Sequence, residues 1–241
     1  EGKAINKLAL VMLSRAVNIL RLVIIAIAMP FLLLSSNISW VVNSPPLYSY
    51  GFEKYDVDLY TGIQIKQLVS AGKQIRDYFG DEKEFITVRV EKDGEIIPNL
   101  YNHREILHMK DVKELIKGVY RSQQVSALLI AVGVLLGFAL PMPGHLGRSV
   151  KWICRGGGIT LVATLFVGLL ALSGFQRFFL YFHLISFSND LWMLDPRKDF
   201  LIMMFPQGFF FDATALIVLL TLAEGLILWF APSLIRKFWN I

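Results

Sequence analysis

The sequence predicts an all-α membrane protein with four transmembrane helices and a small extracytoplasmic α+β cap between spans one and two. Of the 241 residues, 55% are hydrophobic, and the mean hydropathy is +0.54, which is high for a soluble domain. Most of the apolar residues fall in four runs, and a helix needs about 20 such residues to cross a bilayer. The runs lie at about 20–42, 125–140, 156–175 and 213–231.

The first two runs differ from a simple transmembrane segment. The first follows a basic flank, as a signal peptide does, but it is too long for the apolar part of one and no small-x-small cleavage site follows. We therefore expect a retained membrane anchor. The second run is short, but its helical pattern extends back through residues 120–124.

The distribution of charge predicts the orientation. The N-terminal flank, the loop after span two and the C-terminus together hold nine basic residues and one acid, whereas segments 43–121 and 176–212 hold fifteen basic and seventeen acidic residues. Basic excess marks the cytoplasmic side, so both termini are expected in the cytoplasm and both larger segments outside. The net charge of +5 is thus a topological signal, and no nucleic-acid partner is expected.

These features give an expected domain organisation. Residues 1–42 form a cytoplasmic N-terminus and the first span, 43–121 the extracytoplasmic cap, and 122–241 three further spans with an outer interfacial loop at 176–212. The single cysteine, Cys154, is expected in the cytoplasmic loop, which leaves the outer segment without a disulfide.

Four stretches define the cap. The aromatic stretch PPLYSYGFEKYDVDLY is interpreted as an interfacial belt with a proline-directed turn, or else as the lining of a lipid headgroup site. Residues 61–79 have the spacing of an amphipathic helix that ends at Gly80 and Asp81. FITVRV at 85–90 and the Asp93-Gly94 turn predict a β-hairpin. Residues 102–120 are expected to be helical and continuous with span two.

Several small or polar residues lie inside the spans. Neighbouring helices are expected to satisfy the polar patch Ser35, Ser36 and Asn37. Gly133 and Gly137 form a GxxxG pair, and the glycines at 156–158 favour close packing over phosphate binding, because the Lys and Ser/Thr of a phosphate loop are absent. Glu224 is either a functional intramembrane acid or the partner of a base such as Arg21.

The candidate chemistry lies outside the membrane. His108 has Glu105 and Asp111 on its helix face, where a carboxylate can orient an imidazole; an ordinary solvated helix face is the alternative. His183 belongs to the aromatic stretch 176–212, whose polar-edged rings suit the headgroup level. Two outer histidines without an evident nucleophile favour direct acyl or proton transfer by general acid–base catalysis.

Other catalytic classes fit less well. His103 and His108 are five residues apart, so they do not form the HExxH pair of a zinc peptidase, and no spacing specifies a metal site from His108, His183 and carboxylates. Ser186 and Ser188 lie near His183, but there is no GxSxG turn. Cys154 is on the wrong side for an outer site.

Two blocks carry a family resemblance. NHREILHMKDVKELI at 102–116, followed by FHLISFSNDLWMLDPRKDFLIMMFPQGFF at 182–210, resembles the bacterial lipoprotein intramolecular transacylases, and the resemblance covers nearly the whole chain. It implies a bacterial cell-membrane enzyme acting on membrane-anchored diacylated lipoproteins among membrane lipids. The implied reaction moves the sn-2 acyl chain from glycerol to the α-amine of the N-terminal cysteine, giving a lyso-form lipoprotein.

The resemblance maps the catalytic pair onto His108 and His183 and leaves open which one is the base. The reaction requires no metal or organic cofactor. Supporting residues are expected near the pair; Phe182, Met203 and Met204 are expected to contact acyl chains or seal the site. The supporting residues are Glu105, Asp111, Asn189, Asp190 and Trp192.

Two other functions stay open at this stage. A non-enzymatic accessory protein would bind a partner through its cap, and alanine variants of both histidines would then function normally. A membrane lipid ester hydrolase would use the same pair with water as the acceptor, and its product would be a free fatty acid.

Overall fold

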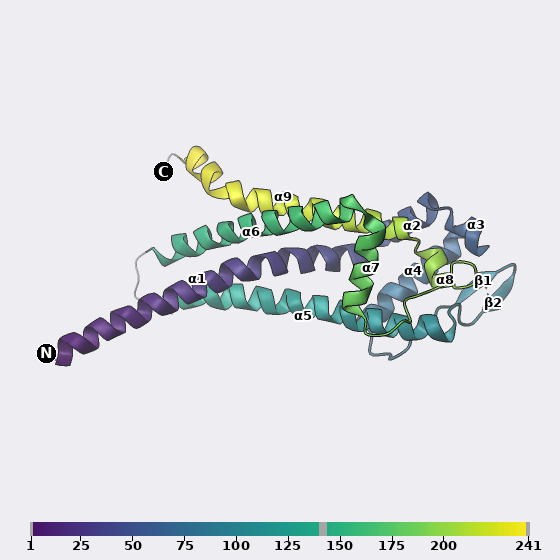
Figure 1. Cartoon of the computed structure of the whole chain (residues 1–241), viewed down its shortest axis with the longest axis horizontal. Helices are drawn as coiled ribbons and strands as arrows, with labels where there is room; N and C mark the ends of the chain where they lie inside the picture. Colours follow the sequence, from purple (N-terminus) through teal and green to yellow (C-terminus); the bar gives the residue numbers. More distant parts are fainter. Residues whose placement is uncertain (1, 140–143, 240–241) are drawn as a thin grey trace. The chain divides into compact units, whose positions relative to one another are not determined.

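The computed structural model describes residues 2–139 and 144–239, and Figure 1 follows the chain through nine helices and one two-stranded sheet in that part. The elements are α1 (Gly2–Val42), α2 (Pro45–Lys54), α3 (Val57–Thr61), α4 (Ile65–Gly80), β1 (Val90–Lys92), β2 (Glu95–Ile97), α5 (His103–Ala139), α6 (His145–Ser173), α7 (Phe175–Ser186), α8 (Phe200–Met204) and α9 (Gln207–Trp239).

The four expected spans are confirmed as helices. Within the described residues, α1, α5, α6 and α9 are each long and apolar enough to cross a bilayer. All four extend beyond their apolar runs, and α5 continues from the cap into span two, as the sequence predicted. The chain is thus a multi-pass membrane protein with a small α+β cap between its first two spans.

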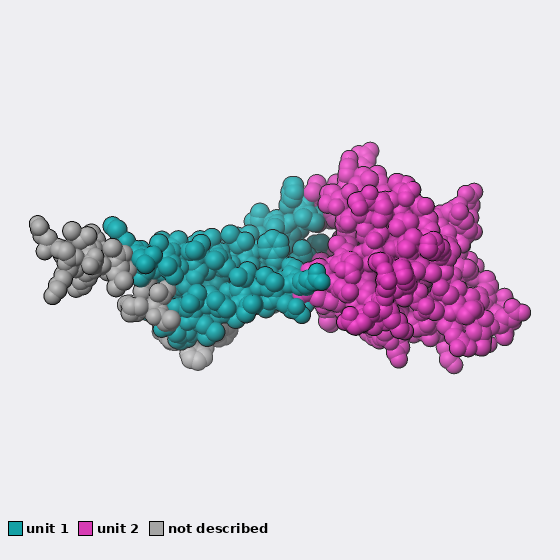
Figure 2. Space-filling view, turned by 90° about the horizontal axis from the view of Figure 1, so that it is seen from below, with its two compact units in different colours: residues 1–37, 121–167, 218–241 teal, residues 38–120, 168–217 magenta. Residues whose placement is uncertain are grey.

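Contacts divide the chain into two compact units, coloured separately in Figure 2. Unit 1 comprises Glu1–Asn37, Arg121–Val167 and Val218–Ile241, and unit 2 comprises Ile38–Tyr120 and Gly168–Ile217. The domain boundaries expected at residues 42 and 121 stay a prediction.

Unit 1 buries an arginine among its helices. The Arg21 guanidinium of α1 donates to Asn18 Oδ1 at 2.8 and 3.0 Å, to the Gly133 carbonyl at 2.8 Å and to Ser149 Oγ at 3.0 Å. Arg21 is 3% exposed, so these acceptors replace the water that a cation loses on burial. The expected pairing of Arg21 with Glu224 is therefore wrong, because uncharged acceptors on α1, α5 and α6 surround the guanidinium.

Glu224 has a different partner. Asn37 Nδ2 donates to Glu224 Oε2 at 2.7 Å and to Thr221 Oγ1 at 3.0 Å, which joins α1 to α9 within unit 1. Gln123 Nε2 donates to Ser36 Oγ at 3.1 Å, and Ser35 Oγ donates to the Phe31 carbonyl of its own helix. Neighbouring helices thus satisfy Asn37 and Ser36, as expected, while α1 itself satisfies Ser35.

The glycines at 156–158 pack tightly against two helices. A Cβ atom at Gly156 would lie 2.9 Å from the Ala26 carbonyl oxygen of α1. A Cβ atom at Gly157 would lie 2.7 Å from Leu228 Cβ and 3.2 Å from the Gly225 carbonyl oxygen, both on α9. Backbone and Cβ atoms cannot rotate away, so a larger residue here would push the helices apart.

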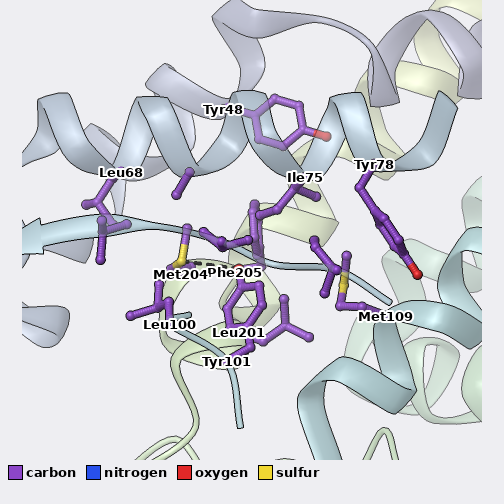
Figure 3. Packing of buried hydrophobic residues seen from close by; sticks show 14 of the residues in the cluster. Tyr48, Leu68, Ile75, Tyr78, Leu100, Tyr101, Met109, Leu201, Met204 and Phe205 are labelled. Carbon is purple, nitrogen blue, oxygen red and sulfur yellow. Dashed lines mark hydrogen bonds between the residues drawn. The ribbon is translucent and has the colours of Figure 1, made fainter. Parts of the chain in front are cut away.

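Unit 2 has its own hydrophobic core, shown in Figure 3. It joins α2, α4, the segment before α5, α5 itself, α8 and the start of α9. Phe52, Leu68, Val88 and Met204 are fully buried in it. Residues far apart in sequence meet here: the Tyr101 hydroxyl donates to Met204 Sδ at 3.4 Å. This core fixes the second histidine-bearing segment against the cap.

The expected proline-directed turn after span one is instead the helix α2. Pro45 and Pro46 occupy its first positions, where a missing N–H costs nothing. Tyr48 and Phe52 point into the core and pack edge-on or tilted against Phe205 at 6.0 and 5.7 Å. Two aromatic side chains of the predicted belt, Tyr48 and Phe52, therefore belong to a buried helix face, whereas Tyr50 and Tyr60 are exposed.

The hairpin is confirmed, but its first strand is shorter than expected. β1 and β2 pair antiparallel around Asp93 and Gly94, which both have positive φ. Residues 85–89 are irregular, because their backbone groups bond to side chains instead: Arg89 N–H to Gln74 Oε1 and Val88 N–H to Asn99 Oδ1. The amphipathic helix also begins later than expected, at Ile65, after Gly62 adopts φ 67°.

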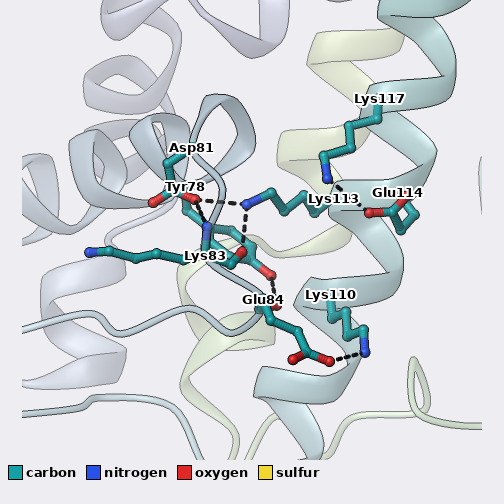
Figure 4. Close-up of polar contacts among 8 residues, drawn as sticks. All are labelled: Tyr78, Asp81, Lys83, Glu84, Lys110, Lys113, Glu114 and Lys117. Atoms are coloured by element: carbon teal, nitrogen blue, oxygen red, sulfur yellow. Dashed lines mark hydrogen bonds and ion pairs between the residues drawn. The ribbon is translucent and has the colours of Figure 1, made fainter.

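A buried lysine fastens α5 to the end of α4 (Figure 4). Lys113 Nζ donates to Asp81 Oδ1 and to the Lys83 carbonyl, both at 2.7 Å, and lies 4.1 Å from the centre of the Tyr78 ring. Lys113 is 2% exposed, and these partners account for its burial. This cluster holds the helix that carries His108.

Cys154 was expected in a loop, but it lies in a helix. α6 begins at His145, so Cys154 is within the helix and is 6% exposed. The basic residues that predicted a loop here belong to the first turns of that helix.

The α6–α9 contact gives a testable prediction. We expect Gly157→Ala to lower the free energy of unfolding by about 1–3 kcal/mol, since its Cβ meets Cβ and backbone atoms of α9. Gly118→Ala, on α5 with nothing within 4 Å, is the matched control and is expected to be neutral or stabilising. Thermal unfolding in detergent measures both, and equal melting temperatures would contradict the close contact.

Candidate active site

His108 lies in the first half of α5 and is 7% exposed. The ring of Phe187 packs edge-on against it, with centroids 5.2 Å apart. Its Nδ1 atom is buried and has no hydrogen-bond partner within residues 2–139 and 144–239. A buried polar atom without a partner is unusual, and such atoms often belong to functional sites.

His183 lies in the last turn of α7 and is 8% exposed. Its Nδ1 atom is 2.7 Å from the Phe179 carbonyl oxygen, one helical turn earlier. A carbonyl only accepts, so Nδ1 carries the proton, and in the neutral ring Nε2 keeps a free lone pair. The backbone of α7 thus selects the tautomer in which Nε2 can take a proton.

Aromatic rings enclose His183. Trp192 lies tilted at 4.9 Å between ring centroids, Phe182 packs edge-on at 5.2 Å, and Phe179 packs edge-on at 4.4 Å. Burial lowers the pKa of His183 below its ordinary 6.5, and the hydrogen bond to Phe179 opposes that shift only in part. The ring is therefore neutral at pH 7 and able to act as a base.

The two imidazoles face each other within unit 2. Their ring centroids are 6.3 Å apart and their planes are inclined by 32°. Figure 1 shows why they meet: α7 turns away from the last residues of α6 and runs to the first part of α5. At this separation two histidines can act on one reacting group. The structure thus brings together the two histidines that the sequence singled out.

Glu105 does not hydrogen-bond to His108 in the part of the chain that the structure describes. Its carboxylate accepts from the Asn102 N–H at 2.8 Å and from the Leu201 N–H at 2.6 Å. Asn102 Oδ1 in turn accepts from the backbone N–H groups of Arg104 and Glu105. This is a capping box at the start of α5, extended to the first turn of α8.

Of the remaining supporting residues, Asp111 lies on α5, and Asn189, Asp190 and Trp192 belong to one loop between α7 and α8. Asn189 Nδ2 donates to Asp111 Oδ2 at 2.9 Å, which ties the loop to α5 one turn from His108. Trp192 Nε1 donates to the Asn189 carbonyl at 2.9 Å, so the same loop positions the ring that covers His183. Arg104 donates to the Asp190 carbonyl and lies 3.4 Å from its carboxylate. These residues hold the loop over the histidines.

Phe182 and Met204 were both expected at the site, but the structure places them in different surroundings. Phe182 contacts His183, whereas Met204 is fully buried in the core of unit 2, where it accepts from Tyr101. His103 begins α5 and is exposed, and His145 belongs to unit 1. Among the residues described, no group of three His, Cys, Asp or Glu side chains is arranged to hold a metal ion.

A pocket of about 510 Å³ opens at the start of α5, and neither His108 nor His183 lines it. One wall is the start of α5 and the other is the segment between Trp192 and α8. Its lining residues are Asn102, Arg104, Met193, Asp195, Lys198 and Asp199.

Comparison with known proteins identifies the family of the chain. The family model described as lipoprotein intramolecular transacylase Lit matches residues 23–210, which include both histidines and the elements that position them. The chain belongs to the Lit family. It is thus a member of a family of membrane acyltransferases.

Two solved structures of a Lit protein share the fold. The in meso structure of the membrane integral lipoprotein intramolecular transacylase Lit from Bacillus cereus has a TM-score of 0.77 and 18% identity, and it covers 92% of this chain and 97% of that chain. A variant of that protein with one histidine changed to arginine has a TM-score of 0.72 and 17% identity, covering 100% and 99%. At these identities the likeness is one of fold.

A curated relative is more similar in sequence. An uncharacterized protein of Aquifex aeolicus (strain VF5) is 27% identical over 138 residues, which cover 57% of this chain. The match spans 59% of that protein, less than two thirds of its length.

Sequence reasoning missed several functional details of this Lit-family chain. The carbonyl of Phe179 fixes the His183 tautomer, and Phe187 packs on His108, yet neither has a sequence signal. Asn102 and Glu105 did have one, because Asn-x-x-Glu before an apolar helix is a capping-box pattern. That pattern predicts Glu105 as a helix-capping residue and not as the partner of the His108 imidazole.

The environment of His183 gives a prediction. Because burial lowers its pKa, the ring should stay neutral as the pH falls through 6.5 and gain a proton only below that value. Carbon-13 NMR of protein labelled at its four histidines measures this, and His183→Asn assigns the signal by removing it. A midpoint at or above 6.5, or an Nε2-protonated neutral ring, would contradict the buried, Phe179-bonded state.

Proposed function

We propose that this protein is a lipoprotein intramolecular transacylase that moves the sn-2 acyl chain of a diacylglyceryl lipoprotein from glycerol to the α-amine of the N-terminal cysteine. The product is a lyso-form lipoprotein. The observation that carries the proposal is the buried pair His108 and His183, with ring centroids 6.3 Å apart, in a chain that belongs to the Lit family.

The reaction needs three things from the protein. The ammonium group must lose a proton before its nitrogen attacks the ester carbonyl. The negative charge that develops on the carbonyl oxygen must be stabilised. The glycerol oxygen must gain a proton as its bond to the acyl carbon breaks. One ester bond breaks and one amide bond forms. Nitrogen loses two protons in all: the ammonium proton is released to solvent before the attack, and the second proton, lost as the amide forms, ends on the glycerol oxygen.

The two histidines suit different parts of this task. His183 presents Nε2 with a free lone pair, so we assign it the removal of the amine proton. The same nitrogen, once protonated, can return the proton to the glycerol oxygen. His108 has a buried Nδ1 without a partner in the described chain, and we assign its ring to the developing oxyanion.

The surroundings of the pair fit a lipid substrate. α7 exposes an apolar face beside His183, with Ile185 85% exposed and Leu184 53% exposed. Such a face buries itself among acyl chains. Trp192 and Phe182 cover the imidazole and exclude water, which would otherwise compete with the amine for the ester.

The proposal includes a location. From the excess of basic residues at 1–19, 140–155 and 232–241, we propose that both termini are cytoplasmic and that the histidine pair acts at the outer face of a bacterial cell membrane. Its substrates would be membrane-anchored diacylated lipoproteins. Glu105, Asp111, Asn189, Asp190 and Trp192 are proposed as positioning residues.

A defined diacylglyceryl lipopeptide tests the proposal. Incubated with the purified protein, it should give an N-acylated lyso product. Because this product has the same mass as the substrate, fragmentation in the mass spectrometer must show that the acyl chain is on the amine. We expect His108→Ala and His183→Ala each to lower kcat by about 10²- to 10⁴-fold, the usual contribution of an acid–base group. His103→Ala, an exposed histidine on the same helix as His108, is the matched control and should retain activity.

The outcomes separate the alternatives. Unchanged substrate with folded wild-type protein would reject transacylation and favour an accessory protein. A free fatty acid in place of the N-acylated product would indicate a lipid ester hydrolase. Full activity in both histidine variants would show that His108 and His183 are not the catalytic residues, although the protein would still catalyse the transfer.

A further inference from the structure

The pocket at the start of α5 is lined by two cations, Arg104 and Lys198, and Arg104 Nη2 is already bonded to Asp190. Its two acids are already engaged: Asp195 accepts from Arg197 Nε and Nη2 at 2.9 and 2.8 Å, and Asp199 accepts from Asn102 Nδ2 and the Asp195 N–H. Arg104 Nε is buried and has no hydrogen-bond partner in residues 2–139 and 144–239. The Lys198 ammonium lines the same pocket.

The pocket lies one helical turn from the catalytic pair. Arg104 and His108 are four residues apart on α5, so they share a face and are separated by about 6 Å along the axis. On the other wall, Met193 follows Trp192, whose ring packs on His183. About two residues of extended peptide span 6 Å.

We propose that this pocket binds the polypeptide that follows the acyl-accepting cysteine, an inference that rests on the proposed function. With the cysteine amine at His183, the next two or so residues of the substrate reach the pocket. Arg104 Nε and Lys198 Nζ donate to main-chain carbonyl oxygens of that segment. Met193 supplies an apolar surface for its side chains.

The mixed charge of the lining favours a peptide over an anionic headgroup. A phosphate would gain from Arg104 and Lys198 but would lie beside the carboxylates of Asp195 and Asp199, in the same pocket. A neutral peptide offers carbonyl oxygens to the cations and brings no negative charge beside the two carboxylates, which already have partners. It is therefore compatible with both kinds of group.

Substrate length tests the inference. The full-length protein is given a diacylglyceryl cysteine that carries a neutral five-residue peptide, and separately the corresponding diacylglyceryl cysteine amide. We expect wild type to have the lower KM for the peptide substrate. Lys198→Glu, at an exposed position, should raise that KM about tenfold with little change in kcat and so remove the preference for the peptide. Lys73→Glu, an exposed lysine on α4, makes the same charge change as a control.

Arg104→Lys provides a second variant that retains the charge and removes Nε. It is expected to weaken the preference for the peptide substrate in the same direction as Lys198→Glu. A preference that is lost in these two variants and kept in Lys73→Glu supports the subsite.

Three results would overturn it. An equal preference for peptide over amide in wild type and Lys198→Glu would show that the pocket does not bind the peptide. Inhibition by dihexanoyl phosphatidylglycerol that depends on Lys198, without an effect of peptide length, would assign the pocket to a lipid headgroup. If wild type forms no N-acylated product from either substrate, the proposed function itself fails and the subsite with it.

Discussion

The buried carboxylate of Glu105 links the two segments that carry the histidines. One oxygen accepts from the Asn102 N–H at the start of α5, and the other accepts from the Leu201 N–H at the start of α8. Hydrogen bonds to a charged group contribute about 1.5–3 kcal/mol each, and leaving such a group unpaired in the interior costs more. Because Glu105 is 1% exposed, α8 must stay where its N–H can reach the carboxylate. That requirement fixes the C-terminal end of the loop that covers His183, where the loop enters α8.

The loop then orders the site in steps. Asn189 bonds to Asp111 on α5, Arg104 holds the backbone at Asp190, and the Asn189 carbonyl fixes the indole of Trp192. The first two bonds start from the face of α5 that also carries His108, and the third lies within the loop. The loop residues thus place an aromatic cover on the His183 imidazole, which is a positioning role in the function proposed above.

In unit 1, polar side chains are buried among apolar helices that pack closely. Two of its buried polar side chains are stabilised by neighbouring polar groups: Arg21 by three neutral acceptors, and Asn37 by Thr221 and Glu224. Glycines at 156–158 let α6 approach α1 and α9 closely, where dispersion contacts replace the hydrophobic effect that lipid does not provide. These contacts stabilise the helices of unit 1, whereas both candidate catalytic histidines lie in unit 2.

The sequence by itself determined the class of the protein. A long apolar segment in a bilayer forms a helix because its backbone groups must bond to one another, so hydropathy predicted the four helices. The Asp-Gly pair predicted the hairpin, because its turn requires positive φ at both residues. The sequence also singled out His108 and His183, since two motif blocks of the Lit family contain them. It did not reveal that the belt after span one is a helix, that Glu105 is a cap, or that Met204 belongs to the core, because burial depends on distant neighbours.

Only the tertiary structure decided how the histidines relate. Their sequence separation is 75 residues, and nothing local brings α7 to α5. The meeting of the rings at 6.3 Å and the free Nε2 of His183 depend on helix directions and on one backbone carbonyl. Sequence patterns record which residues are available, while the packing of unit 2 determines which of them share a site, because long-range contacts leave no periodic signal in the chain.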